Sequence, residues 1–162
     1  MQEVVEFILS SIIMVVTPII FGVLTLDNNI RKDKSKVVVA FLISCIIYSL
    51  CYSYFNGGIK TLIGFLLHIL IFNQIFKIGV NKSIFVTFVY VLFVMLIEFL
   101  ILIIIIFVLK MPKDYCYNIY AGSLISNFVV NIIVIVMTKI LLKYIKKIVD
   151  INLSKTYLLF VF

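Results

Sequence analysis

The stretch IFVTFVYVLFVMLIEFLILIIIIFVL, residues Ile84–Leu109, decides the fold class of this chain. Its 26 residues include a single charged side chain, Glu98. As a helix it would be about 39 Å long, which exceeds the roughly 30 Å hydrocarbon core of a bilayer. Its apolar residues are continuous rather than alternating, which favours a helix over a barrel strand. The stretch is therefore predicted to be a transmembrane helix.

The composition extends this conclusion to the whole chain. Of the 162 residues, 65% are hydrophobic, and the mean hydropathy is +1.30. A soluble domain is only about 45–50% apolar. Because only helices and closed barrels satisfy their backbone inside lipid, we expect an all-α, polytopic integral membrane helix bundle.

The apolar stretches predict five transmembrane helices and the start of a sixth. The predicted spans are residues 4–26, 37–55, 59–76, 84–109 and 118–142, with another span starting at residue 157. The first span is preceded by Glu3 rather than by basic residues, so it is expected to be retained and not cleaved as a signal peptide. No soluble domain interrupts the spans, so residues 1–162 are predicted to form a single transmembrane domain.

The basic residues predict the orientation of these spans. Eleven of the 14 Lys and Arg residues lie in alternate gaps on one side, beginning with NNIRKDKSK (Asn28–Lys36), and three lie on the other side. The positive-inside rule then places the N-terminus outside. A net charge of +7 on a soluble protein would suggest nucleic acid, but here the topology accounts for it, and no nucleic-acid partner is predicted.

Pro18 lies deep in the first span, within TPIIFG (Thr17–Gly22). A proline there removes one backbone hydrogen bond and clashes with the carbonyl of Met14, so a kink is expected. The kink serves helix packing, or it acts as a hinge that moves during signalling.

His68 and Glu98 are functional candidates because ionisable groups inside a membrane are costly to keep. The register of the hairpins places His68 near Ser44, Cys45 and Tyr48, and Glu98 near Lys60 or Gly64. His68 and Glu98 themselves are offset by about 10 Å along the axis. Either residue has a structural reading, as a hydrogen-bonded neutral imidazole or a carboxyl that fixes packing. Each also has a functional reading, as a ligand contact or proton site.

Asn127 and Asn131 continue a polar stripe that starts at Ser123 on the fifth span. Small and polar residues at this spacing let helices approach closely and hydrogen-bond. Helix packing is one interpretation of the stripe, and a ligand pocket lined by the asparagines is the other.

Lys139, Lys143, Lys146 and Lys147 fall on one side of a helix that follows the fifth span. Apolar side chains occupy much of the remaining surface. This pattern predicts an amphipathic helix at the inner membrane surface, where each lysine gains about 1 kcal/mol from anionic lipid.

Sequence motifs for catalysis, metals and cofactors are missing. There is no Gly-rich phosphate loop, no HExxH and no nucleophile elbow. The three cysteines form no CxxC pair and no metal-ligand spacing. We therefore expect no enzyme activity, no cofactor and no metal.

Several features together resemble the sensor region of peptide-sensing histidine kinases of the accessory-gene-regulator type, which carry a GHKL ATPase domain. They are an N-out first span with TPIIFG, a basic first inner loop, short outer loops, KILLKYIKKI (Lys139–Ile148) and the restart INLSKTYLLF (Ile151–Phe160). The resemblance implies a multi-pass protein of the bacterial plasma membrane that binds a secreted peptide, and a homodimeric kinase. The kinase motifs are absent here, so the chain is expected to be a fragment or a truncated relative.

Two other functions remain open from the sequence. The chain is a small multi-pass transporter or transport subunit if Glu98, His68 and Asn127 line a transport path for a substrate. It is a membrane assembly or immunity factor if it binds no ligand.

Overall fold

The computed structural model describes residues 2–26, 34–54, 58–108, 110 and 124–149, and these residues are all-helical, with no strand among them. The helices are α1 (Gln2–Thr25), α2 (Lys34–Tyr54), α3 (Gly58–Phe76), α4 (Val80–Ile103), the π-helical turn η1 (Ile104–Val108), α6 (Leu124–Ile140) and α7 (Leu142–Val149). The predicted all-α fold is confirmed for this part of the chain.

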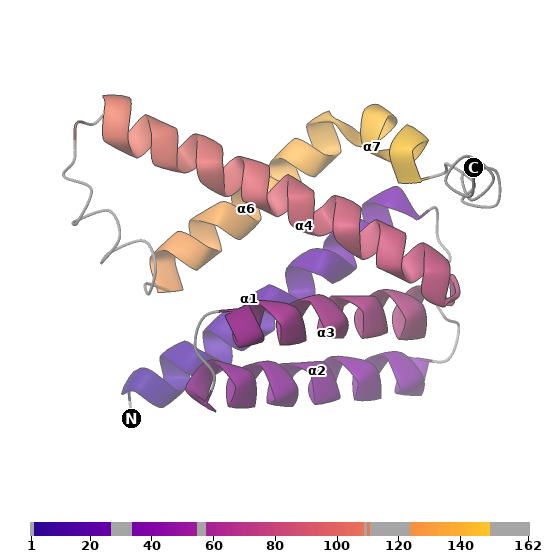
Figure 1. The fold of residues 1–162 in the computed structure, drawn as a ribbon. Coiled ribbons are helices and arrows are strands. Elements are labelled where there is room, and N and C mark those ends of the chain that lie inside the picture. Colours follow the sequence, from indigo (N-terminus) through magenta and orange to yellow (C-terminus); the bar gives the residue numbers. More distant parts are fainter. Residues whose placement is uncertain (1, 27–33, 55–57, 109, 111–123, 150–162) are drawn as a thin grey trace.

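Helix α1 is the element that the others share. It packs against α2, α3, α6 and α7. Figure 1 shows α2 and α3 side by side, with α1 running obliquely behind them and α4 crossing α6. Any displacement of α1 is therefore felt by most of the described bundle.

The described helices include fewer membrane spans than the sequence predicted. Ile8–Thr25 and Val80–Val108 are long and apolar enough to cross a membrane, and α6 with α7 makes a third span if this bent pair is counted as one. The predicted five spans are not supported, because α2 is not among the helices that meet this test and the apolar helix at Thr61–Phe76 is short. The predicted restart at residue 157 lies outside the described residues. These helices nevertheless identify a membrane protein.

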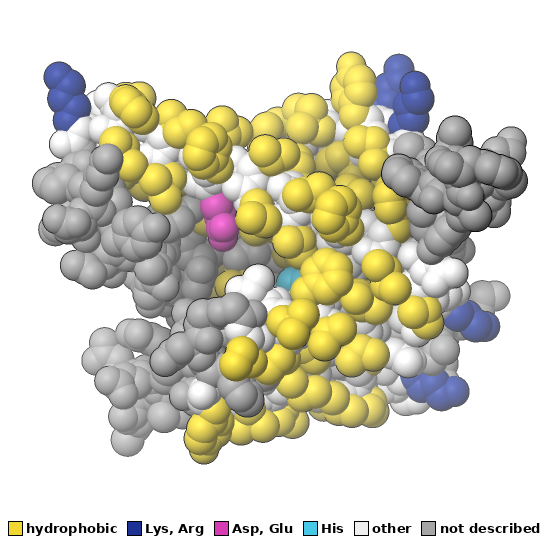
Figure 2. Space-filling model, viewed as in Figure 1, with side chains coloured by type: hydrophobic (Ala, Val, Ile, Leu, Met, Phe, Trp, Pro, Cys, Tyr) yellow, Lys and Arg dark blue, Asp and Glu magenta, His cyan; other side chains and the backbone are white. Residues whose placement is uncertain are grey.

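The bundle has apolar side chains outside and many polar ones inside. Many leucines and isoleucines along α2, α3 and α4 are half exposed or more, including Leu62 and Leu96 at 60% each. Figure 2 shows hydrophobic side chains over the middle of the molecule and Lys and Arg at its edges. This distribution suits a solvent of lipid chains, in which the hydrophobic effect does not drive helices together.

Several buried hydroxyl groups bond to the preceding turn of backbone, whereas the hydroxyl of Thr87 in α4 is buried without a partner. Thr17, Thr25, Ser44, Ser83 and Thr138 each donate to the carbonyl four residues earlier, at 2.6–2.9 Å. Between helices, Ser49 of α2 donates to Ser11 of α1 at 2.9 Å. Because lipid offers no hydrogen-bond partners, such pairing lets small polar residues occupy the helix interfaces.

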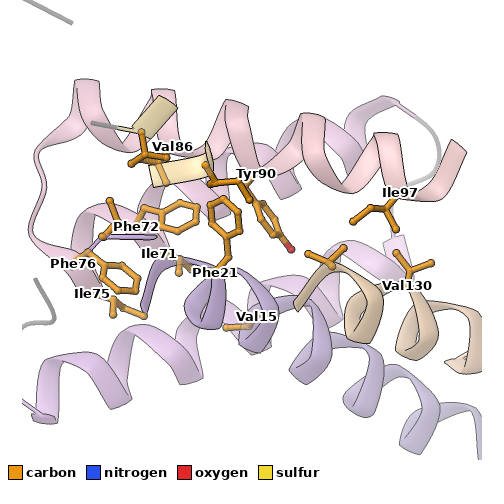
Figure 3. Packing of buried hydrophobic residues seen from close by; sticks show 14 residues of the cluster. Val15, Phe21, Ile71, Phe72, Ile75, Phe76, Val86, Tyr90, Ile97 and Val130 are labelled. Carbon is orange, nitrogen blue, oxygen red and sulfur yellow. The ribbon is translucent and has the colours of Figure 1, made fainter. Parts of the chain in front are cut away.

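Aromatic rings fill the centre of the bundle. Figure 3 shows Phe21 of α1 beside Phe72 and Tyr90, and their ring centroids lie 6.4 Å and 5.2 Å from that of Phe21. Phe76 packs against Phe72 at 6.0 Å, and its ring lies where a Cβ on Gly22 would project. Gly22 therefore lets α1 and α3 come together at this level.

Most lysines of the described residues lie toward one end of the bundle, and Lys110 lies toward the other. The start of α2, the end of α3, the start of α4 and the whole of α7 lie at the lysine-rich end, and the end of η1 lies at the other (Figure 1). Lys34, Lys77 and Lys82 flank those helix ends, and Lys110 follows η1. In the described part of the chain, positive charge is thus concentrated toward one end of the bundle axis.

Helix α7 turns away from α6 by 84°. Its Ile145 and Val149 are 5% and 1% exposed and belong to the same apolar core as Phe21 and Tyr90. Tyr144 and Ile148 remain exposed. The burial of one face of α7 against α1 and α4 explains why the helix folds back instead of extending α6.

Candidate functional site: a buried histidine between two tyrosines

His68 of α3 is 9% exposed and hydrogen-bonded to the neighbouring helix α2. Its Nε2 lies 3.0 Å from the hydroxyl of Tyr48, and the two ring centroids are 5.8 Å apart. The hairpin register predicted this neighbour, and the prediction is confirmed. The antiparallel pairing of α2 and α3 is what sets the two side chains at one level.

Tyr90 of α4 covers the other side of the imidazole. Its ring meets that of His68 edge-on, with centroids 5.1 Å apart, and Tyr90 is only 3% exposed. Sequence reasoning missed this residue. The available signal was a lone tyrosine in the middle of an apolar span, since tyrosine usually sits at the membrane interface.

The second ring nitrogen of His68 approaches α1. Nδ1 is buried without a hydrogen-bond partner, and the imidazole lies near the backbone carbonyl of Met14. That carbonyl lacks its helical N–H partner because residue 18, which would supply it, is a proline. Pro18 thereby leaves a backbone acceptor of α1 close to His68.

Tyr48 has a second acceptor within reach. Its hydroxyl lies 3.4 Å from the carbonyl oxygen of Gly64, one turn from His68. The hydroxyl has one proton, so it can donate to His68 Nε2 or to Gly64. In the first case a proton on Nδ1 faces Met14, and in the second Nε2–H donates to Tyr48. The site can therefore hold two hydrogen-bond arrangements with a neutral imidazole.

Glu98 lies apart from the histidine, as its predicted offset requires. It is exposed on α4, and no ion pair with His68 forms. Tyr90 lies between them, within electrostatic range of both Glu98 and Tyr48. The side chain of Lys60, the partner predicted for Glu98, lies outside the described residues. Figure 2 shows acidic atoms beside hydrophobic side chains on this face.

Asn131 is placed at a different location from His68. It is 7% exposed and lines a small cavity of about 150 Å³ between α1 and α6, together with Ile13 and Thr17. Asn127 belongs to α6, but its side chain lies outside the described residues. Of the predicted ligand residues, His68 and Asn131 thus lie at different helix interfaces, and both interfaces include α1.

Pro18 is buried inside α1, which continues through it to Thr25. Thr17 beside it donates to the carbonyl of Ile13 at 2.9 Å. The basic residues Lys139, Lys143, Lys146 and Lys147 lie at the end of α6 and along α7. No group of three potential metal ligands occurs among the described residues.

The arrangement provides a polar contact between packed helices, and it shows no nucleophile paired with a base. Comparison with family models, curated proteins and solved structures finds no match for this chain.

Proposed function

We propose that this chain is the membrane sensor part of a peptide-responsive histidine kinase of the accessory-gene-regulator type. In this proposal it has five spans and the start of a sixth, an outside N-terminus and a place in the bacterial plasma membrane. It recognises a secreted peptide, dimerises, and relays the signal to a cytoplasmic kinase domain that is not part of the chain.

The packing of His68 of α3 against α2 and α4, beside α1, is the observation that carries the proposal. His68 also lies near the backbone of Met14 in the proline-containing helix α1. A signal needs an element with two discrete arrangements. The two hydrogen-bond arrangements of Tyr48, His68 and Gly64 supply them, and Pro18 gives α1 a point at which to bend.

Helix α7 provides the output in this mechanism. It packs on α1 through a face that includes Ile145 and Val149. A shift of α1 therefore changes the position of α7. Its lysines suit contact with an anionic inner leaflet. A change in the tilt of α7 would then alter the segment that follows it.

The separation of lysines along the bundle supports the proposed orientation. Lys34, Lys77 and the α7 lysines lie toward one end, as the positive-inside rule expects of the cytoplasmic side. With that end inside, α1 begins outside, and the end of α2 and the start of α3 face the exterior.

Transport accounts less well for the described residues. A transport path needs polar residues that face a common cavity. His68 is enclosed between aromatic rings, Asn131 faces the α1–α6 cavity, and Glu98 lies on the surface of α4. Receptor function requires no continuous path through the bundle.

Peptide binding can be tested directly on the purified chain in lipid nanodiscs. The probe is the peptide fraction of the culture medium of the bacterium that encodes the chain, and the control is the same fraction after protease digestion. Binding stabilises the folded state by about 2.7 kcal/mol at a ligand concentration 100 times the Kd. We expect the undigested fraction alone to raise the Tm.

A transporter would give a different pattern of results. The proposal is overturned if the Tm is unchanged by the fraction while proteoliposomes take up protons in a manner that Glu98→Gln abolishes. A Tm rise that survives protease digestion would also contradict it, because the ligand would not be a peptide.

A further inference from the structure

A surface groove runs between α2 and α3, and its lining includes Ile47 and Leu67, the residues that precede Tyr48 and His68. Its volume is about 340 Å³, within the range of small-molecule binding sites. Its walls are formed by the apolar side chains Val39, Ile43, Ile47 and Leu70, which are exposed or half-exposed, and by the buried Leu67.

Polar side chains close only one end of the groove. Ser35 and Lys36 of α2 and Gln74 of α3 line this end, whereas the wall toward Ile47 is apolar apart from Ser44. The hydroxyl of Ser44 is already bonded to the carbonyl of Ala40. The groove therefore matches a lipid in polarity. It has polar side chains at one end, where a headgroup would lie, and apolar walls along the rest.

The length of the groove corresponds to one leaflet. Lys36 and Ile47 are separated by 11 residues of helix, which is about 16 Å along the axis. Half of the hydrocarbon core of a bilayer is about 15 Å. An acyl chain that starts at the level of Lys36 would thus lie in the groove over most of the length that it spans in one leaflet.

Positive charge is concentrated at the polar end. Lys34 lies at the start of α2, and Lys77 follows the last residue of α3, so both flank the end that Lys36 lines. Each lysine near a membrane surface favours anionic lipid. We propose that the α2–α3 groove binds one anionic glycerophospholipid, with its phosphate among these lysines and one acyl chain along Val39, Ile43 and Ile47.

This binding site is independent of the proposed peptide signal. It follows from the groove and its charges, and it holds for either orientation of the bundle. A bound lipid would bridge α2 and α3 and would reach Ile47, the residue that precedes Tyr48 in α2.

The chain contains no tryptophan, so a single introduced tryptophan can report on lipid contact. We suggest Ile43→Trp inside the groove and Leu42→Trp as the control. Leu42 is the adjacent residue, is 53% exposed, and does not line the groove. Both proteins are reconstituted in phosphatidylcholine vesicles that contain a small fraction of phosphatidylglycerol brominated on its acyl chains.

Brominated phosphatidylglycerol should quench Ile43→Trp more strongly than Leu42→Trp. Brominated phosphatidylcholine at the same fraction should quench the two equally. Replacing Lys34, Lys36 and Lys77 by Gln should remove the difference, since each lysine contributes about a fivefold preference for anionic lipid. Circular dichroism and gel filtration of each variant establish that it is folded.

Two results would overturn the proposal. Equal quenching at both positions by the anionic lipid would show a lipid-facing surface without selectivity. Protection of Ile43→Trp from both brominated lipids would show that protein fills the groove, either a second copy or another segment of this chain.

Discussion

His68 of α3 lies near the backbone of Met14, four residues before Pro18 in α1. The proline leaves the Met14 carbonyl without its helical N–H partner, and the buried Nδ1 of His68 also has no hydrogen-bond partner. Proline thus creates an acceptor in α1 at the level where α3 carries the histidine. Neither residue would have this role alone.

Pro18→Ala tests whether this arrangement matters. Alanine restores the N–H to the Met14 carbonyl and removes the clash, so α1 should keep or gain stability. We expect the Tm of the unliganded chain to stay level or rise, while the response of α7 to the peptide fraction is lost. Ile20→Ala, two residues further along α1, serves as the control and should leave the response intact. A Pro18→Ala protein that responds normally would remove the hinge from the mechanism.

Tyr48→Phe should destabilise the bundle by about 1–3 kcal/mol. The substitution removes the partner of His68 Nε2 and leaves a buried polar nitrogen unsatisfied. Denaturant unfolding in detergent measures the effect, and Tyr54→Phe at an exposed site is the control.

The double variant Tyr48→Phe, His68→Leu sharpens the interpretation of that loss. Replacing both partners by apolar groups is close to neutral in comparable cases. The double variant should therefore recover most of the stability lost in Tyr48→Phe. Additive losses would show that the two side chains do not interact.

Gly22→Ala should cost about 1–3 kcal/mol, because the new methyl group would collide with the Phe76 ring. Thermal unfolding of the chain in nanodiscs measures the change. Phe76→Leu in the same chain makes room for the methyl group and should recover part of the loss. If Gly22→Ala alone unfolds like the unaltered chain, α1 and α3 are further apart than described.

The proposed orientation predicts the accessibility of single cysteines. With the native cysteines replaced by serine, a membrane-impermeant maleimide should label Tyr54→Cys and Lys110→Cys in intact cells. Lys34→Cys, Lys77→Cys and Lys143→Cys should be labelled only after permeabilisation. The reverse pattern would place the N-terminus inside and contradict the receptor orientation.

The helices and the Tyr48–His68 contact could be predicted because both follow from local geometry. Apolar runs give the helices, and a hairpin with a short connection fixes which residues of α2 and α3 share a level. Tyr90 of α4, which packs against the His68 ring, was not identified in this way. The hairpin register was sufficient for the contact between α2 and α3.

Contacts that involve α1 were beyond this reasoning. Its neighbours include α6 and α7, which are distant in the chain, so no hairpin register predicts which residues meet. The proximity of Met14 to His68 and the cavity beside Asn131 both depend on that packing. The 84° turn before α7 has the same origin, since no Pro or Gly lies between Ile140 and Leu142 to cause it.

The relay from α1 to α7 is the central claim, and a distance between spin labels tests it most directly. Labels at Val23 and Ile148 occupy exposed positions on the two helices. We predict that the peptide fraction shifts their distance distribution in nanodiscs, and that Pro18→Ala or His68→Leu abolishes the shift. A fraction that raises the Tm but leaves this distance unchanged would contradict the account.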